Sequence, residues 1–129
     1  KPVNKAIYIK SGKFDLFKNR NKTMFSLHQA VHDGSGEKEL VDAINLPELF
    51  DQHKVGHVNL MKLDCEGTEF EIFGSLTFKE VASKIDCVIT EMHDWSGRQP
   101  QQLIDSLKYN GFEVTTAPAD AKIIVGYKK

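Results

Sequence analysis

The feature that most constrains the fold is the segment from Val58 to Phe73, VNLMKLDCEGTEFEIF, in which an apolar run ends at an acidic turn. The apolar run is typical of a buried parallel strand, and Asp64 and Glu66 follow it directly. The residues after Gly67 have the pattern of a helix. In open α/β sheets, ligands bind beyond the carboxyl ends of the strands, where such turns lie. The segment therefore predicts an α/β fold with a site at Asp64.

A second apolar run, Cys87 to Met92, also ends in polar residues. Residues two apart in a strand project to the same face, so we expect Glu91 and His93 on one side of the sheet. If this strand lies beside the strand that precedes Asp64, the polar side chains of both meet at one edge. The side chains predicted to converge there are Asp64, Glu66, Glu69, Glu91 and His93.

Each of these residues also has an ordinary structural interpretation. Glu69 suits the positive end of a helix, and Glu66 suits a solvated turn. For Asp64, at the end of a buried strand, a functional role is favoured. Neighbouring acids would hold the His93 imidazole in one tautomer, which suits a general base. Trp95 follows in a loop, where covering a substrate and packing are equally good interpretations.

The rest of the chain alternates predicted strands and helices. Two β-prone runs around Ser11 and Gly12 fit either a hairpin or a strand followed by an edge strand. Capping-box patterns predict helices that begin near Asn45 and Thr68, the second one including Leu76. The alternation predicts a parallel sheet with covering helices and a final antiparallel hairpin. The further expected elements are strands at 112–116 and 122–127 and helices at 78–84 and 100–110.

Composition places the chain among ordinary globular domains. It has 129 residues, of which 40% are hydrophobic and 27% charged, which suits a single domain with its own core. No apolar run is long enough to span a bilayer, and the N-terminus lacks the apolar core of a signal peptide. We therefore expect a soluble, cytoplasmic protein without a membrane partner.

Cysteine and charge patterns exclude further classes of protein. Cys65 and Cys87 belong to no CxxC pair and are expected at opposite ends of the sheet, as reduced thiols. The first 22 residues hold seven basic side chains against the single acid Asp15. Without clustered aromatic residues or an RNA-binding motif, this segment is better explained as a solvated face than as a nucleic-acid surface.

The sequence KLDCEGTEFEIF resembles the K-I-D-[VC]-E-G-x-E-x-x-[VIL]-[LF] signature of FkbM-type methyltransferases, a branch of the S-adenosylmethionine-dependent enzymes with a Rossmann-like sheet. KAIYIKSGKFDLF, VDAINLPELF and CVITEMH are similar to its neighbouring segments, so the resemblance covers nearly the whole chain. The matching signature positions are Lys62, Asp64, Glu66, Gly67 and Glu69.

The resemblance covers only the second half of the family domain. The glycine-rich turn after the first strand and the ribose-binding acid after the second strand are not in the sequence. The chain also begins at Lys1 without a methionine. The resemblance therefore implies that residues 1–129 are a single unit, the C-terminal part of a partial Rossmann-like methyltransferase domain.

The implied chemistry is methyl transfer from S-adenosylmethionine to an oxygen or nitrogen of a small acceptor, most simply a hydroxyl of a sugar-like or polyketide-like molecule. Asp64 or His93 would accept the hydroxyl proton. By the same resemblance, Ala6, Ile7 and Asp64 would contact the cofactor, and Glu66, Glu69, Glu91 and Trp95 would orient the acceptor.

Two alternatives remain open. Asp64, Glu66, Glu91 and His93 are also ligand types that hold a hard divalent cation for metal-dependent hydrolysis. The chain could instead be a non-catalytic association module, because half of a sheet exposes a strand edge that pairs with another copy or another protein. A metal-dependent rise in melting temperature would support the first alternative, and self-association would support the second.

Overall fold

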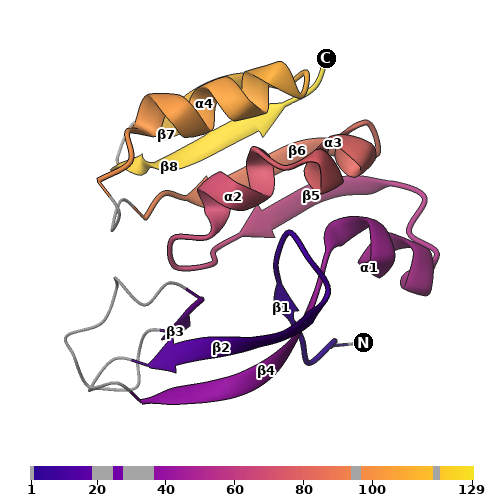
Figure 1. Cartoon of the computed structure of the whole chain (residues 1–129). Coiled ribbons are helices and arrows are strands. Elements are labelled where there is room, and N and C mark those ends of the chain that lie inside the picture. The colour runs from indigo at the N-terminus through magenta and orange to yellow at the C-terminus, as the bar shows by residue number, and fades with distance from the viewer. Residues whose placement is uncertain (1, 19–24, 28–36, 94–96, 118–119) are drawn as a thin grey trace.

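The computed structural model describes residues 2–18, 25–27, 37–93, 97–117 and 120–129. Their strands form two small mixed sheets, each of four strands, and the helices gather beside the second sheet (Figure 1). The mixed α/β class expected from the sequence is confirmed. The prediction of one mainly parallel sheet is wrong, because the N-terminal strands pair among themselves and form a separate sheet.

The first sheet has the strand order β1 (Ala6–Ile7), β4 (Lys38–Ile44), β2 (Gly12–Lys18) and β3 (Phe25–Ser26). β1 runs parallel to β4, whereas β2 is antiparallel to both β4 and β3. The two runs around Ser11 and Gly12 do form strands, but they are not a hairpin, because β4 lies between them.

The second sheet has the strand order β5 (Val58–Leu63), β6 (Ile85–Glu91), β8 (Asp120–Tyr127) and β7 (Glu113–Ala117). β5 and β6 are parallel, as expected, and their carboxyl ends lie at the same edge. The predicted C-terminal hairpin is confirmed, with β8 antiparallel to both β6 and β7. This sheet therefore places the ends of β5 and β6 side by side.

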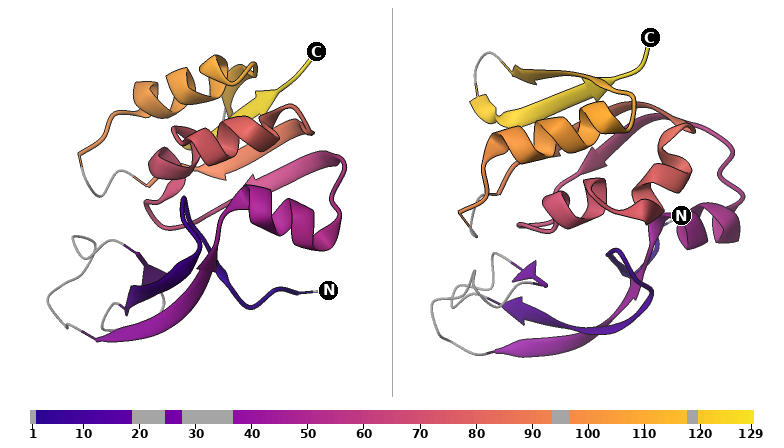
Figure 2. Two further views of the ribbon diagram at one scale, coloured as in Figure 1. Left: turned by 45° about the vertical axis from the view of Figure 1, so that its right-hand side comes forward. Right: turned by 45° about the horizontal axis from the view of Figure 1, so that its top comes forward.

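The helices are α1 (Leu46–His53), α2 (Glu69–Phe73), α3 (Leu76–Ala82) and α4 (Pro100–Tyr109). α2, α3 and α4 lie on the same face of the second sheet, and α1 packs against α3 (Figure 2). The core lies between these helices and the sheet. Its completely buried members include Phe73, Phe78, Ile85, Val88, Leu103, Leu107 and Ile124.

The opposite face of the second sheet is more open. Leu60, Cys87 and Tyr127 are paired across three neighbouring strands, and Leu60 and Tyr127 are 55% and 41% exposed. Within the described residues, β5 pairs with a strand on one side only. Association through this edge stays a prediction. Both cysteines are free thiols, as expected.

The helix starts test the two predicted capping boxes. At α1 the Asn45 side chain accepts from the Glu48 amide at 2.9 Å, which confirms the cap. At α2 the helix begins directly after Thr68, as predicted, but the capping box is wrong: Thr68 has helical backbone angles and its side chain makes no capping bond. α2 ends at Phe73, and Leu76 belongs to α3, where it is exposed. None of the described helices has the length and apolarity needed to cross a bilayer.

Candidate functional site

The turn after β5 has an unusual backbone that follows from its sequence. Glu66 has φ = 49° and Gly67 has φ = 102°, two consecutive residues in the left-handed region. Glycine adopts this conformation without steric cost, whereas Glu66 adopts it only because its surroundings enforce it. The turn directs two backbone N–H groups toward one carboxylate, since Cys65 and Gly67 donate to Glu69 at 2.7 and 2.9 Å.

Glu69 is completely buried at the start of α2. Its two carboxylate oxygens each accept one of these backbone N–H bonds, and His93 Nδ1 lies 3.1 Å from Oε1. The sequence placed Glu69 among the residues that orient the acceptor. That role does not fit a side chain without exposed surface, and the structure instead has Glu69 holding the turn.

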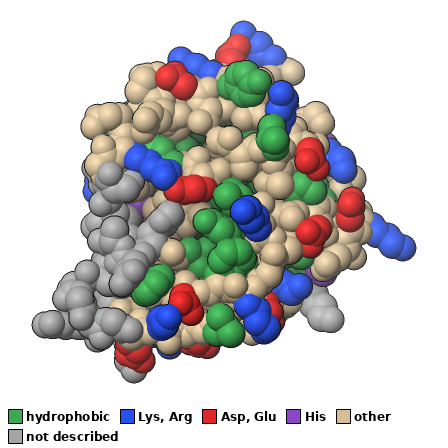
Figure 3. Space-filling model, in the orientation of Figure 1, with side chains coloured by type: hydrophobic (Ala, Val, Ile, Leu, Met, Phe, Trp, Pro, Cys, Tyr) green, Lys and Arg blue, Asp and Glu red, His purple; other side chains and the backbone are tan. Residues whose placement is uncertain are grey.

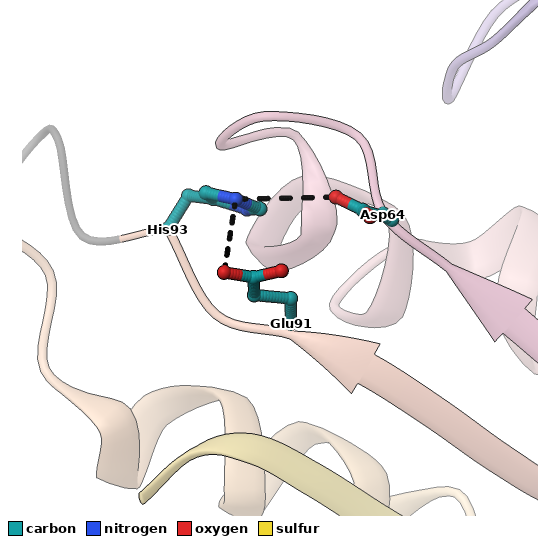
Figure 4. A group of neighbouring side chains, drawn as sticks. All are labelled: Asp64, Glu91 and His93. Atoms are coloured by element: carbon teal, nitrogen blue, oxygen red, sulfur yellow. Dashed lines mark ion pairs between the residues drawn. The ribbon is translucent and has the colours of Figure 1, made fainter. Parts of the chain in front are cut away.

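His93 lies just past the end of β6 and brings the predicted residues together. Its side chain is 10% exposed. Nε2 lies 3.5 Å from Glu66 Oε2 and 3.9 Å from both Asp64 Oδ1 and Glu91 Oε1. Figure 4 shows Asp64 and Glu91 pointing toward the imidazole from the ends of neighbouring strands. The structure thus gathers at one edge all five side chains that were predicted to converge.

The acids around His93 form the open side of this cluster. Asp64 and Glu91 have 36% and 40% of their side chains exposed, so an incoming molecule can reach them. Glu66 is 27% exposed, but its Oε2, the oxygen nearest His93, is itself buried and accepts no hydrogen bond. Asp64 also accepts from Lys62 Nζ at 3.1 Å through its other oxygen. A buried residue, Glu69, therefore supports an accessible set of acceptor oxygens.

Burial, together with the crowding of negative charge, raises the pKa of two titratable groups. Burial raises the pKa of Glu66 above its ordinary value, and Asp64, Glu69 and Glu91 raise it further, while His93 opposes them. Burial raises the pKa of the Cys65 thiol to about 12, with Glu69 as the next contributor. Cys65 is therefore a neutral thiol at physiological pH and has no thiolate for nucleophilic chemistry.

Part of this cluster could also hold a metal ion. Within the described residues, the group with suitable ligand atoms, all within 4.8 Å of one another, consists of Asp64, Glu91 and His93. Ligands of one magnesium ion each lie about 2.1 Å from it, so no two can be more than about 4.2 Å apart. Hydrogen bonds of about 2.8 Å to a single oxygen span wider separations. The distances of 3.9 Å from His93 Nε2 to Asp64 and Glu91 suit hydrogen bonds to one bound hydroxyl without any movement of the side chains. To become neighbouring ligands of one magnesium ion, the same atoms would have to move closer together.

The first sheet is joined to this turn by one buried hydrogen bond. Ser26 Oγ on β3 donates to the Glu66 carbonyl at 2.7 Å, and Ser26 is 1% exposed. Nothing in the sequence near Ser26 predicted this contact, because its partner is 40 residues away. The bond ties the left-handed turn to the first sheet.

A cavity of about 470 Å³ lies between the first sheet and the turn. Ala6 and Ile7 line it, as does Cys65, whereas the adjacent Asp64 does not. Figure 3 shows hydrophobic side chains gathered in this part of the surface, between the first sheet and the helices. The full lining consists of Asn4, Lys5, Ala6, Ile7, Leu16, Leu27, Glu39, Leu40, Val41, Asp42, Cys65 and Thr68. Trp95, the other predicted acceptor contact, lies outside the described residues.

Comparisons with known proteins give one positive result. No curated protein and no solved structure matches the chain. Residues 3–114 match the Methyltransferase FkbM domain, a span that includes both sheets' parallel strand pairs and every residue of the cluster around His93. A match over most of the sequence shows the family, so this chain belongs to the FkbM methyltransferases.

Proposed function

We propose that this chain is part of a domain that transfers a methyl group from S-adenosylmethionine to a hydroxyl oxygen of a small, sugar-like or polyketide-like acceptor. Membership of the FkbM methyltransferases supports the reaction class. The observation that carries the choice of a hydroxyl is the pair of exposed carboxylates, Asp64 and Glu91, each with an oxygen 3.9 Å from His93 Nε2. Such oxygens accept from a hydroxyl, and they disfavour an anionic acceptor by charge repulsion.

In this proposal the second sheet is one half of a Rossmann-like methyltransferase sheet. The parallel pair β5 and β6, each followed by helices on one face, supports this assignment. The reversed strand β8 supports it as well, because it enters the sheet between β6 and β7 and ends the parallel run. The acidic turn after β5 then lies at the carboxyl edge, where open α/β sheets bind ligands.

The cavity beside the turn fits an adenosyl cofactor. Its volume of about 470 Å³ lies within the usual range of small-molecule sites. Ala6, Ile7 and Val41 offer apolar surface for a flat base, and Glu39 and Asp42 offer oxygens for ribose hydroxyls. When bound, S-adenosylmethionine supplies a methyl group activated by the sulfonium. We propose contacts with Ala6 and Ile7 in the cavity and with Asp64 at its edge.

The residues of the cluster would orient the acceptor and take its proton. Glu66 and Glu91 accept hydrogen bonds from acceptor hydroxyls, which fixes the reacting oxygen for in-line approach. His93 Nε2, or Asp64 in its place, accepts the proton of that oxygen as it becomes a nucleophile. Orientation is the larger contribution, because holding two reactants in place supplies about 7–11 kcal/mol in well-aligned systems.

The test is the transfer of a labelled methyl group from S-adenosylmethionine to a panel of polyhydroxylated acceptors. Because general acid–base groups contribute about 10²–10⁴-fold, we expect His93→Gln to lower kcat by about 100-fold or more, and Asp64→Asn to lower it markedly.

The chain contains a matched control pair. His57 and Asp86 form an exposed histidine–aspartate contact of 2.9 Å at the other end of the second sheet. His57→Gln and Asp86→Asn should leave transfer unchanged. The proposal would be contradicted if methyl transfer fell equally in the His93 and Asp64 variants and in the control variants. It would also be contradicted if no hydroxyl acceptor were methylated. The metal-dependent hydrolase is not favoured, because the family is one of methyltransferases.

A further inference from the structure

Among the residues that the structure describes, Glu69 is the only buried acid. It cannot contact an acceptor, because none of its surface is exposed. Its carboxylate nevertheless lies against the imidazole of His93, the proposed proton acceptor. The position of Glu69 therefore concerns how His93 is held.

Three nitrogen atoms surround the two carboxylate oxygens of Glu69, which together offer about four lone pairs. Oε1 faces the Cys65 amide at 2.7 Å and His93 Nδ1 at 3.1 Å, and Oε2 faces the Gly67 amide at 2.9 Å. An ionised carboxylate can only accept hydrogen bonds. His93 Nδ1 must therefore carry its proton and donate it to Oε1.

This bond determines which ring nitrogen carries the lone pair in the neutral imidazole. With the proton on Nδ1, the lone pair is on Nε2, the nitrogen 3.5–3.9 Å from Glu66, Asp64 and Glu91. A carboxylate behind a histidine fixes the tautomer in the same way in other catalytic sites. We propose that Glu69 is a positioning residue that holds His93 in the Nδ1–H tautomer and directs the Nε2 lone pair toward the acceptor.

The arrangement explains why an amide cannot replace this carboxylate. If the oxygen of a glutamine faced Cys65 and His93, its NH₂ group would face the Gly67 N–H, donor against donor. If the amide were turned round, its NH₂ group would face the Cys65 N–H, again donor against donor, and also His93 Nδ1, which would then have to accept. The second arrangement moves the imidazole proton to Nε2 and removes the proton acceptor from the site.

Nitrogen NMR of the imidazole tests this inference, which rests on the proposed function only for its role in catalysis. In the wild-type chain, the neutral form of His93 should be the Nδ1–H tautomer, assigned by the loss of its signals in His93→Gln. In Glu69→Gln the Nε2–H form should appear beside Nδ1–H, because each orientation of the amide leaves one donor facing another and only one of them keeps the proton on Nδ1. Glu71→Gln, a change two residues away on α2, should leave the Nδ1–H form in place.

Kinetics provides a second test. Glu69→Gln should lower kcat several-fold or more and leave KM nearly unchanged, because Glu69 acts through the base and does not touch the acceptor. An Nε2–H tautomer in the wild-type chain would overturn the inference, and this measurement does not depend on the stability of any Glu69 variant. If the tautomer is Nδ1–H but no acceptor is methylated, the proposed function fails while the positioning role stands.

Discussion

The two sheets differ in how they are stabilised, and the candidate site lies where they meet. The second sheet packs against three helices around completely buried side chains such as Phe73 and Phe78. The first sheet buries few side chains, and ion pairs on its surface include Lys13 with Asp42, both largely exposed. Exposed ion pairs contribute little to stability, whereas buried aromatic side chains contribute several kcal/mol. The second sheet therefore supplies a rigid frame for His93 and its acids, and the first sheet supplies a cavity wall that is more easily opened.

The largest expected difference lies between aromatic residues of the two regions. Phe73→Ala should lower the free energy of unfolding by about 3–5 kcal/mol, because it removes a completely buried ring from the core. Phe14→Ala on β2 should cost clearly less, since Phe14 is only half-buried, with its ring edge-on to that of Tyr8. Urea denaturation measures both. Equal losses would show that the first sheet is as important to stability as the second.

The second prediction concerns the turn between β5 and α2, which carries Glu66 and Gly67. Gly67→Ala should destabilise the chain by about 1–3 kcal/mol, because φ = 102° is a strained conformation for alanine. It should also loosen the bonds to Glu69. The matched control is Gly56→Ala, which has open space around the added methyl group and should be nearly neutral. An unchanged melting temperature for Gly67→Ala would contradict the structure of the turn.

The third prediction tests the contact between the regions. Ser26→Ala removes the hydrogen bond to the Glu66 carbonyl and should cost about 1 kcal/mol. The loss should appear mainly as faster hydrogen exchange in β2 and β3, with protection in β5 and β6 retained. Ser83→Ala at the exposed end of α3 serves as the control. Uniformly faster exchange in both sheets would mean that they open as one unit.

The smallest expected effect concerns pH. Because the pKa of Glu66 is raised in the folded chain, its ionisation weakens folding as pH rises through that pKa. Glu66→Gln avoids this loss, so its melting temperature should exceed that of the wild type at neutral pH. The gap should close as pH falls below the ordinary glutamate value of 4.5. A gap that stays constant across this range would show that Glu66 titrates normally.

Local patterns predicted much of the fold. Apolar runs and helix periodicity gave the strands that end near Asp64 and Glu91, and the Asn45 cap gave α1. The convergence around His93 followed from strand alternation together with parallel neighbours. These features depend on residues a few positions apart, or on one pairing rule.

Other features depend on contacts between distant residues and could not be predicted. The division into two sheets requires β1 and β2 to pair on opposite sides of β4. The bond from Ser26 to the turn leaves no local pattern. Glu69 resembled an ordinary acid at a helix start, and only the three-dimensional structure shows it buried behind His93. The first sheet's role as a cavity wall likewise appears only once the two sheets are placed together.

The central claim is that the meeting of the two sheets forms the cofactor and acceptor site. The most direct test is an amide NMR titration of the ¹⁵N-labelled chain with S-adenosylhomocysteine, the non-reactive product of S-adenosylmethionine. We predict saturable shifts at Ala6, Ile7 and Cys65, which line the cavity, and at Asp64 beside it. No saturable shifts, or shifts confined to the groove around Leu76 and Tyr109 between the helices, would contradict the claim.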